Sequence, residues 1–212
     1  MNITVVIPAR NEAGNIARVV DGVLAQGYRA VVIDGRSTDQ TCAIAQAHGA
    51  EVITQTTSGK GGAIVEAGYL VADGAIVFVD ADQSHDPADI PRMVSPLLRN
   101  EADLVIGSRM LGGSDELFSG VREFTRLVGG HILTLMIAKR FKHPLTESQN
   151  GFRAIRVEVL RDLHLRQQSF TIETEMCIEA LRRGYRVMEV RSHEYRRAAG
   201  TSNINPLKLA PL

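Results

Sequence analysis

The sequence predicts an α/β protein, a single compact domain in which a mostly parallel β-sheet is flanked by helices. Short runs rich in Val and Ile alternate with segments whose apolar residues recur every three or four positions, as buried strands alternate with amphipathic helices. Strands spaced in this way are joined by right-handed crossovers, which produce a parallel sheet. The 212 residues suffice for a full core, and 44% hydrophobic with 23% charged residues is ordinary for a globular protein.

Strands and helices alternate through the first half of the chain. Residues 3–7 form a β-branched run ended by Pro8, and a helix follows from about Asn11 to Gly27. The apolar face of that helix consists of Ile16, Val19, Val20, Val23 and Leu24. The later strands are expected at residues 30–33, 51–53, 75–79 and 103–107, with helices at about 37–47, 60–72 and 86–99.

The pattern loosens after Arg109. Residues 112–115 have the composition of a mobile loop, and a long helix with a basic end is expected over 121–140. Residues 152–155 are strand-like, a helix covers 172–183 and is closed by Gly184, and residues 185–190 form a strand. This half is expected to pack with the first half in one domain.

Composition excludes several classes of protein. Lys+Arg and Asp+Glu both total 24, so no global field favours nucleic acid. Cys42 and Cys177 lie far apart and in no metal-ligand spacing, which fits two core thiols in a reducing compartment. No signal peptide and no apolar stretch of roughly 18–20 residues is visible, so we expect a cytoplasmic protein that does not cross a membrane.

Two basic segments lie in the second half. Between residues 121 and 143 there are five basic residues against one acid, and between 182 and 197 there are six Arg against two acids. Such runs usually form a solvated surface. Two of them in one half favour an anionic acceptor or a membrane surface.

Asp80 and Asp82 follow the buried strand 75–79 directly, at the sheet edge where α/β proteins bind ligands. Crowded carboxylates repel each other unless a cation compensates them. Mg²⁺ and Mn²⁺ prefer oxygen ligands, so one interpretation is a site for a metal and a diphosphate. The alternative is a turn rich in Asp, and the pair alone does not decide between them.

Other polar residues are expected at the same edge. Asp34 ends the second strand, where an acid can hold a ribose or base. Ser37 and Gln40 form a capping-box pattern, so Ser37 with Asp39 reads first as a helix cap. The sequence has neither G-x-G-x-x-G nor a complete P-loop around Lys60, which argues against a Rossmann dehydrogenase and a P-loop kinase.

The ordered motifs resemble the family 2 glycosyltransferases of the GT-A fold. The first half supplies VIPARNE (6–12), IDGRSTD (33–39), GKG (59–61), VDAD (79–82) and GSR (107–109). The second half is similar to the dolichol-phosphate mannose synthase and polyprenyl-phosphate glycosyltransferase branch through QNGFRA (149–154), SFTIE (169–173), EV (189–190) and RAAGTS (197–202). The resemblance implies a Rossmann-like GT-A domain over residues 1–203, with a nucleotide-sugar half to about 109, an acceptor half from 110 and a tail at 204–212.

The resemblance also implies an activity, namely inverting, metal-dependent transfer of a sugar from a nucleotide-sugar to a polyprenyl (dolichyl-type) phosphate, at the cytosolic face of a membrane. The implied catalytic residues are Asp80, Asp82 and Arg109, with Mg²⁺ or Mn²⁺ held by Asp82 and Asp80. The implied nucleotide-binding residues are Pro8, Ala9, Glu12, Asp34 and Lys60. The implied acceptor-phosphate residues are Arg122, Arg126 and Arg197.

Several alternatives stay open. The chain could be a soluble family 2 transferase that acts on a sugar or a small phosphorylated acceptor, or a non-catalytic nucleotide-sugar or membrane-binding module. A phosphate acceptor needs no general base, whereas a hydroxyl acceptor would need one, for which Glu173 and Glu175 are the candidates. His85 is expected at the surface, with metal ligation as the alternative. The helix over 121–140 either lies in a membrane interface or packs on the sheet.

Overall fold

The computed structural model describes residues 1–115 and 121–197, and for residues 121–127 it describes the backbone alone. The strands are β1 (Ile3–Ala9), β2 (Arg29–Asp34), β3 (Glu51–Thr54), β4 (Ala75–Phe78), β5 (Leu104–Ser108), β6 (Arg153–Arg156) and β7 (Val187–Arg191). The helices are α1 (Ile16–Ala25), α2 (Thr41–Ala47), α3 (Gly59–Leu70), the 3₁₀ turn η1 (Pro87–Asp89), α4 (Ile90–Leu98), α5 (Arg109–Gly112), α6 (Val121–Phe141), α7 (Val157–Asp162) and α8 (Ile172–Arg182).

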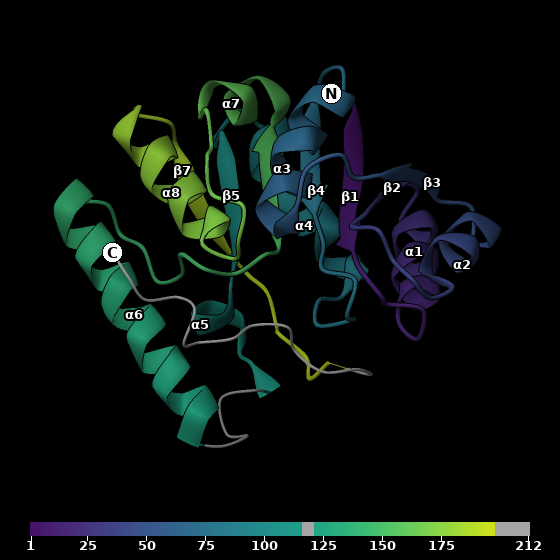
Figure 1. The fold of residues 1–212 in the computed structure, drawn as a ribbon. Coiled ribbons are helices and arrows are strands. Elements are labelled where there is room, and N and C mark those ends of the chain that lie inside the picture. The colour runs from purple at the N-terminus through teal and green to yellow at the C-terminus, as the bar shows by residue number, and fades with distance from the viewer. Residues whose placement is uncertain (116–120, 198–212) are drawn as a thin grey trace.

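The strands form one sheet in the order β3-β2-β1-β4-β6-β5-β7 (Figure 1). Neighbouring strands are parallel except around β6, which runs antiparallel to both β4 and β5. The expectation of a mostly parallel sheet is therefore confirmed. Because β6 comes from the second half of the sequence and lies between β4 and β5 of the first, the two halves share one sheet.

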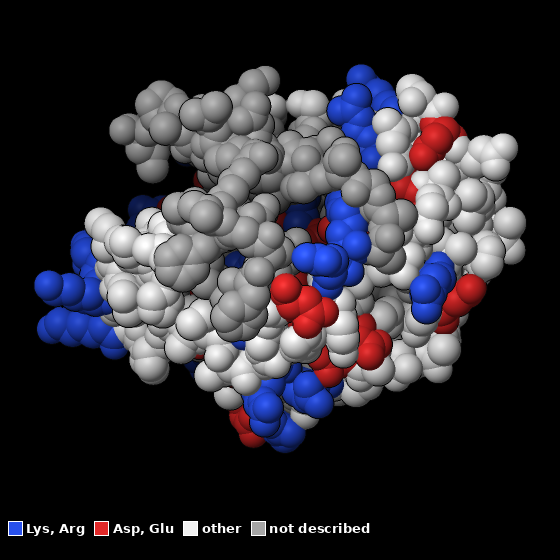
Figure 2. All heavy atoms as spheres, turned by 90° about the horizontal axis from the view of Figure 1, so that it is seen from below, with Lys and Arg blue, Asp and Glu red and all other residues white. Residues whose placement is uncertain are grey.

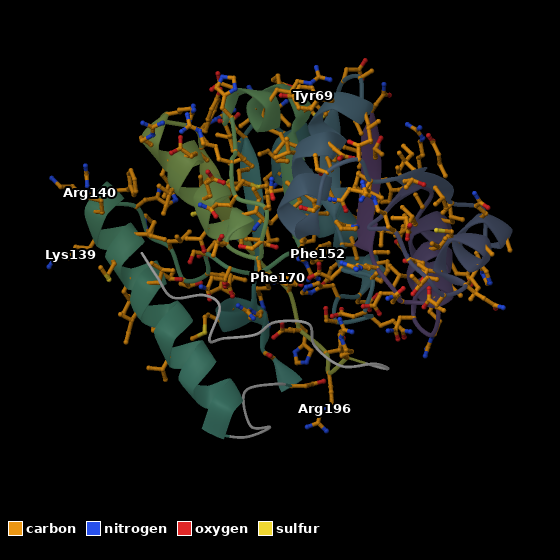
Figure 3. The ribbon with its side chains drawn as sticks, viewed as in Figure 1. Tyr69, Lys139, Arg140, Phe152, Phe170 and Arg196 are labelled. Carbon is orange, nitrogen blue, oxygen red and sulfur yellow. The ribbon has the colours of Figure 1, made fainter. Side chains whose placement is uncertain are left out.

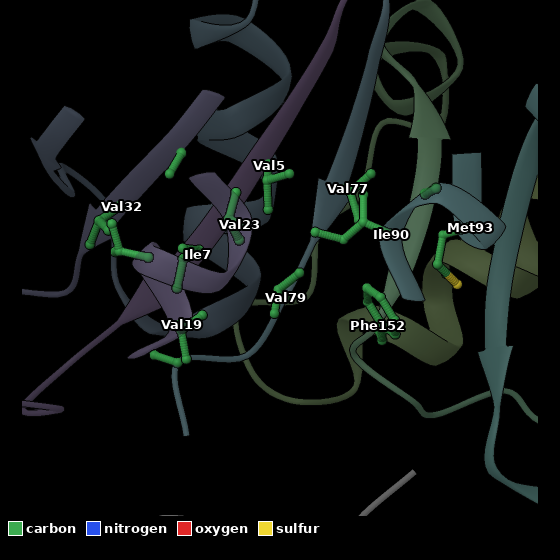
Figure 4. Packing of buried hydrophobic residues seen from close by; sticks show 14 of the residues in the cluster. Val5, Ile7, Val19, Val23, Val32, Val77, Val79, Ile90, Met93 and Phe152 are labelled. Atoms are coloured by element: carbon green, nitrogen blue, oxygen red, sulfur yellow. The ribbon is translucent and has the colours of Figure 1, made fainter. Parts of the chain in front are cut away.

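Hydrophobic cores cover both faces of the sheet. Val5 and Ile7 of β1 pack into the core beneath α1, α2 and α4, which Figure 4 shows from close by. Val6, between them in sequence, packs on the opposite face with residues of α3, α7 and α8. Successive strand residues point to opposite faces, so a run that is apolar at every position is a strand covered on both sides.

The first strand and helix differ in extent from the prediction. β1 continues through Pro8, which is paired in register with Ile33. The Val6 carbonyl accepts a hydrogen bond from Val79 N–H, so the backbone groups of Val6 point towards β4. Pro8, two residues on, has its backbone nitrogen on the same side, past the end of β4. The N–H that Pro8 lacks therefore removes no hydrogen bond to β2. Helix α1 begins at Ile16 because Asn11 has a φ of 56° and residues 12–15 form a turn.

The prediction of a helix-capping box at Ser37 and Gln40 was wrong. Helix α2 begins at Thr41, and the Ser37 hydroxyl instead accepts a hydrogen bond of 2.9 Å from Asn11 N–H. Asp39 does accept from Thr41 N–H at 3.0 Å, but it also accepts from Ala13 N–H at 3.2 Å. These side chains therefore join the loops that follow β1 and β2, which a purely local pattern does not reveal.

Where a mobile loop was expected at residues 112–115, the structure has the end of a short helix and an isolated bridge. Residues 109–112 form the short helix α5, and Ser114 forms a parallel bridge with Glu194. The Ser114 hydroxyl donates to the Glu194 carboxylate at 2.6 Å. The segment after β5 is thus tied to the segment after β7, because both leave the same edge of the sheet.

Helix α6 has the predicted extent and stands at one side of the sheet (Figure 1). Its Thr134 and Ile137 are buried, whereas Val128, Ile132, Leu135 and Met136 are exposed. Within the described residues no helix is sufficiently long and apolar to span a membrane.

Candidate active site

A cavity of about 1590 Å³ opens at the carboxyl ends of the parallel strands. Figure 2 views the molecule from below, and basic and acidic side chains lie next to one another on this face. Eight of the predicted site residues line the cavity: Pro8, Ala9, Glu12, Lys60, Asp80, Asp82, Arg109 and Arg197. The structure therefore brings together residues from the ends of β1, β4 and β5, from α3 and from the segment after β7.

Asp80 leaves the end of β4 and meets Lys60 of α3. The Lys60 ammonium lies 2.5 Å from Asp80 Oδ1 and 2.8 Å from Oε1 of Glu173, which lies in the first turn of α8. The ring of Phe170 lies 5.8 Å from the same ammonium, near the centre of Figure 3. One cation, whose side chain is 13% exposed, thus joins a carboxylate from each half of the chain.

Gly151 makes this close approach possible. A Cβ at this position would lie 2.5 Å from Asp80 Oδ2 and 2.5 Å from Lys60 Nζ. Any side chain would therefore push both charged groups away.

Charge pairing fixes the protonation states in this part of the cavity. Burial by itself raises the pKa of Asp80, but the neighbouring Lys60 ammonium outweighs it and leaves that pKa below its usual value. Burial opposes the charge of Lys60 too, yet Asp80 and Glu173 raise its pKa above that of a free lysine. Asp80 is therefore a carboxylate and Lys60 an ammonium at neutral pH.

Asp82 forms a second ion pair across the cavity. Its Oδ2 lies 3.1 Å from a guanidinium nitrogen of Arg197, and its Oδ1 accepts a hydrogen bond of 3.0 Å from Ser84 N–H. The Arg197 guanidinium also lies 3.1 Å from Glu12 Oε1. Arg197 thus connects the loop after β1 with the loop after β4.

The donor set around Asp82 suits a cation whose remaining ligands come from a substrate. Among the described side chains, those of residues 1–115 and 128–197, no group of three or more His, Cys, Asp and Glu could hold a metal. Asp82 lies on the cavity wall with part of its side chain exposed, and it already binds the positive charge of Arg197. Asp80 and Asp82 both line the cavity, are both partly exposed and are each paired with one cation, so the structure offers either carboxylate to a metal, with diphosphate oxygens and water to complete the shell.

Arg109 lies in a network of carboxylates. Its guanidinium binds both oxygens of Glu147, at 2.6 and 3.1 Å, and lies 3.2 Å from Glu194. The pKa of Arg109 is raised because these two carboxylates outweigh the cost of its burial. The guanidinium joins the segments after β5 and β7 to the loop before β6. Neither carboxylate was predicted as a site residue, although Glu194 follows the end of β7 closely, as Asp80 follows the end of β4.

Arg153 is a buried residue that holds together the backbone around the site. It is 1% exposed, and its guanidinium donates to the backbone carbonyls of Asn150, Glu173 and Ser148 at 2.7, 2.6 and 2.6 Å. The loop that carries Gly151 is thereby fixed to the first turn of α8. The motif QNGFRA contains this residue, but nothing in its pattern shows that Arg153 points inward.

His85 is buried rather than exposed, so the prediction of a surface histidine was wrong. Its Nε2 lies 3.9 Å from Asp80 Oδ2, and its ring stacks on Phe152 at 5.2 Å. Burial lowers the pKa of His85, against the opposing effect of Asp80. The side chain therefore supports the end of β4 as a neutral imidazole.

The other predicted residues have different surroundings. Asp34 is 3% exposed and accepts a hydrogen bond of 3.0 Å from Ser37 N–H, and it is not part of the cavity lining. Of the basic segment 182–197, Arg197 faces the cavity, whereas Arg183 pairs with Glu179 and Arg186 with Asp103. The side chains of Arg122 and Arg126 lie outside the described residues.

One wall of the cavity is formed by α6. Gly130 and Thr134 line the cavity, and the Thr134 hydroxyl is 2.7 Å from that of Ser148. A Cβ on Gly130 would meet Gln149 Oε1 at 2.3 Å. Helix α6 is therefore packed directly against the loop that supports Asp80 and Lys60.

A mostly parallel sheet with paired carboxylates and cations around a cavity at its carboxyl edge is the arrangement expected of a GT-A-type transferase. Residues 4–164 match the sequence profile described as glycosyl transferase family 2, and the chain belongs to this family. It is therefore a glycosyltransferase, as its resemblance to that family predicted.

Relatives and solved structures agree with this assignment. The chain is 32% identical over 210 residues to the glycosyltransferase AglJ of Haloferax volcanii, covering 97% of this chain and 67% of AglJ. It is 30% identical over 189 residues to a dolichol-phosphate mannosyltransferase of Pyrococcus furiosus, covering 84% and 53%. Glucosyl-3-phosphoglycerate synthase of Mycobacterium tuberculosis, solved with Mn²⁺, UDP and phosphoglyceric acid, superposes with a TM-score of 0.76 at 25% identity, covering 98% and 73%.

Proposed function

We propose that this enzyme transfers a sugar from a nucleotide-sugar to a polyprenyl phosphate, with inversion at the anomeric carbon and with Mg²⁺ or Mn²⁺ as cofactor. The observation that carries the acceptor assignment is the double role of α6. Its inner face lines the cavity, and its outer face exposes Val128, Ile132, Leu135 and Met136.

The outer face of α6 supports an acceptor that arrives on a membrane surface. The four exposed apolar side chains recur at helical spacing, and Lys139, Arg140 and Lys142 lie at the end of the helix. Lys139 and Arg140 point away from the sheet (Figure 3). An apolar stripe beside a basic end suits a bilayer with anionic headgroups, and α6 would then place the cavity next to the lipid. The protein would act peripherally at the cytosolic face.

The donor assignment rests on the carboxyl edge of the sheet. Pro8, Ala9 and Glu12 line the cavity at the end of β1 and would contact the nucleoside, with Asp34 stabilising the loop beside them. Asp82 would hold the metal that binds the diphosphate. The M. tuberculosis synthase has been solved with Mn²⁺ and UDP-glucose at 25% identity to this chain, so UDP-sugars are the first donors to test.

The chemistry then needs charge compensation more than proton transfer. The acceptor phosphate is already anionic, so the enzyme's task is to hold it in line behind the anomeric carbon. Arg197 would exchange its contacts with Asp82 and Glu12 for phosphate oxygens, and Arg122 and Arg126 are proposed as further phosphate ligands. Arg109 would act indirectly by fixing the three segments that it joins. A bound metal would neutralise the leaving nucleoside diphosphate.

A second acceptor class is favoured by one feature, the carboxylate of Glu173 in the cavity. If the acceptor were a small phosphorylated compound with a free hydroxyl, Glu173 would be placed to take its proton, whereas Glu175 accepts from backbone N–H groups of residues 166 and 167. The likeness to a synthase solved with phosphoglyceric acid points the same way.

The two acceptor classes are separated by one experiment. The enzyme is incubated with labelled UDP- and GDP-sugars and Mn²⁺, together with a short polyprenyl phosphate in vesicles and with 3-phosphoglycerate. Label in the lipid fraction supports the proposal, and label in phosphoglycerate alone overturns it. Leu135→Ser with Met136→Ser is expected to reduce sedimentation with phosphatidylglycerol vesicles. Tyr69→Ser should not, because Tyr69 is 72% exposed on α3, away from α6 (Figure 3).

A further inference from the structure

Glu173 is a buried carboxylate with too few partners. It is 2% exposed, and apart from its ion pair with Lys60 neither carboxylate oxygen has a hydrogen-bond donor among the described residues. A carboxylate can accept about four hydrogen bonds, and one that is buried without them is costly. Since Glu173 lines the cavity, the missing donors can come from a ligand.

Neighbouring carboxylates do not share this deficit. Glu147 accepts from the Arg109 guanidinium and from Gln149 N–H, and Glu175 accepts from the backbone of residues 166 and 167. Their geometry is explained by the fold. The geometry of Glu173 is not, although Arg153 fixes its backbone through a hydrogen bond of 2.6 Å to the carbonyl. A buried carboxylate whose backbone is fixed and whose only partner among the described residues is one ammonium has room for donors from a ligand.

The charge around Glu173 determines which kind of ligand fits. Lys60 lies between Asp80 and Glu173, so the three groups carry one net negative charge. An acceptor phosphate or a diphosphate would be repelled there and would prefer the Arg197 side of the cavity. Sugar hydroxyls are neutral donors, and two neighbouring hydroxyls can bind one carboxylate together. The Lys60 ammonium lies 2.5 Å from Asp80 and 2.8 Å from Glu173, so the two carboxylates are close neighbours in the cavity lining. One ligand can therefore contact both.

We propose that Glu173, held beside Asp80 by Lys60, accepts hydrogen bonds from ring hydroxyls of the donor sugar and determines which sugar the enzyme takes. This inference rests on the proposed nucleotide-sugar donor and gives Glu173 a recognition role in place of a general base. Glu173→Gln should then weaken the contribution of the sugar to binding without weakening that of the nucleoside diphosphate.

The test compares each nucleoside diphosphate with its sugar conjugate. Titration calorimetry with Mn²⁺ measures the dissociation constants of UDP, UDP-glucose, GDP and GDP-mannose for the wild type, for Glu173→Gln and for Glu158→Gln. Glu158 is exposed on α7 and serves as the control for the same change of charge. The ratio of the two constants for one nucleotide isolates the contribution of the sugar. For Glu173→Gln this contribution is expected to fall about tenfold or more, the effect of losing a hydrogen bond to a charged group.

Deoxy-sugar donors give the second measurement. A donor lacking the hydroxyl that Glu173 binds should lose affinity for the wild type and lose little more for Glu173→Gln, because the two changes remove the same contact. Equal sugar contributions in wild type and Glu173→Gln, with diphosphate binding intact, would overturn the inference alone. A wild type that binds none of UDP, UDP-glucose, GDP and GDP-mannose would overturn the proposed donor class as well. If diphosphate binding is also lost in Glu173→Gln, the residue serves the fold and the inference is wrong.

Discussion

Substituting Gly151 by alanine adds one methyl group between the two charged groups at the centre of the cavity. The new Cβ would lie 2.5 Å from both Asp80 Oδ2 and Lys60 Nζ, so each must retreat by roughly 0.9 Å to reach an ordinary contact of 3.4 Å. Gly151 has no positive φ, so the backbone itself accepts alanine. The substitution therefore displaces the site and leaves the fold in place.

The expected magnitudes follow from that displacement. A misplacement of about 1 Å in a catalytic site costs on the order of 100-fold in rate. Weakening a charged hydrogen bond costs about 1.5–3 kcal/mol of stability, and alanine returns about 0.4–1 kcal/mol by restricting the unfolded chain. We expect kcat to fall about 100-fold, while the free energy of unfolding falls by roughly 1–2 kcal/mol.

The assay combines steady-state transfer of a labelled sugar with urea unfolding. Gly129→Ala is the matched control, because a Cβ there meets nothing within 4 Å and alanine favours the helix. Its turnover should match that of the wild type. If Gly151→Ala also keeps turnover within threefold of wild type, the positions of Asp80 and Lys60 do not govern catalysis and the reasoning fails.

Two further predictions concern the supports of the site. Arg153→Met leaves three buried carbonyls without their donor and should lower the free energy of unfolding in urea by about 3–5 kcal/mol, whereas a loss under 1 kcal/mol would contradict the role of the guanidinium. Burial raises the pKa of Glu147, but Arg109 and backbone donors outweigh it and hold that pKa below its ordinary value. The pair therefore stabilises the fold above a pH of about 4.3 and loses this effect as pH falls through the folded-state pKa. Glu147→Gln should be less stable at neutral pH and lose less on acidification than the wild type, and equal acid sensitivity would contradict this.

The parts of the site that sequence predicted are those whose signal is local. Asp80 and Asp82 follow an apolar strand directly, and a strand buried on both faces ends at the ligand-binding edge of the sheet. Their placement needs no knowledge of distant residues. The alternation of strands and helices predicted the parallel sheet for the same reason.

The parts that sequence missed depend on distant contacts. The partner of Lys60 on α8 and the insertion of β6 between β4 and β5 are set by packing, which leaves no periodic trace. At Ser37 a local rule gave the wrong answer, because the hydroxyl binds Asn11 across two loops in preference to its own helix. Where the local sequence signal was weak, contacts between distant residues thus determined the structure.

The central claim is that Asp82 holds a metal-bound nucleoside diphosphate while the acceptor supplies the attacking oxygen. The most direct measurement is Mn²⁺-dependent transfer of a labelled sugar to polyprenyl phosphate by the wild type and by Asp82→Asn, with binding of the diphosphate followed in parallel. The account predicts that Asp82→Asn loses at least 100-fold in transfer and that Mn²⁺ no longer strengthens diphosphate binding. Transfer by Asp82→Asn at the wild-type rate, with the same Mn²⁺ dependence, would contradict it.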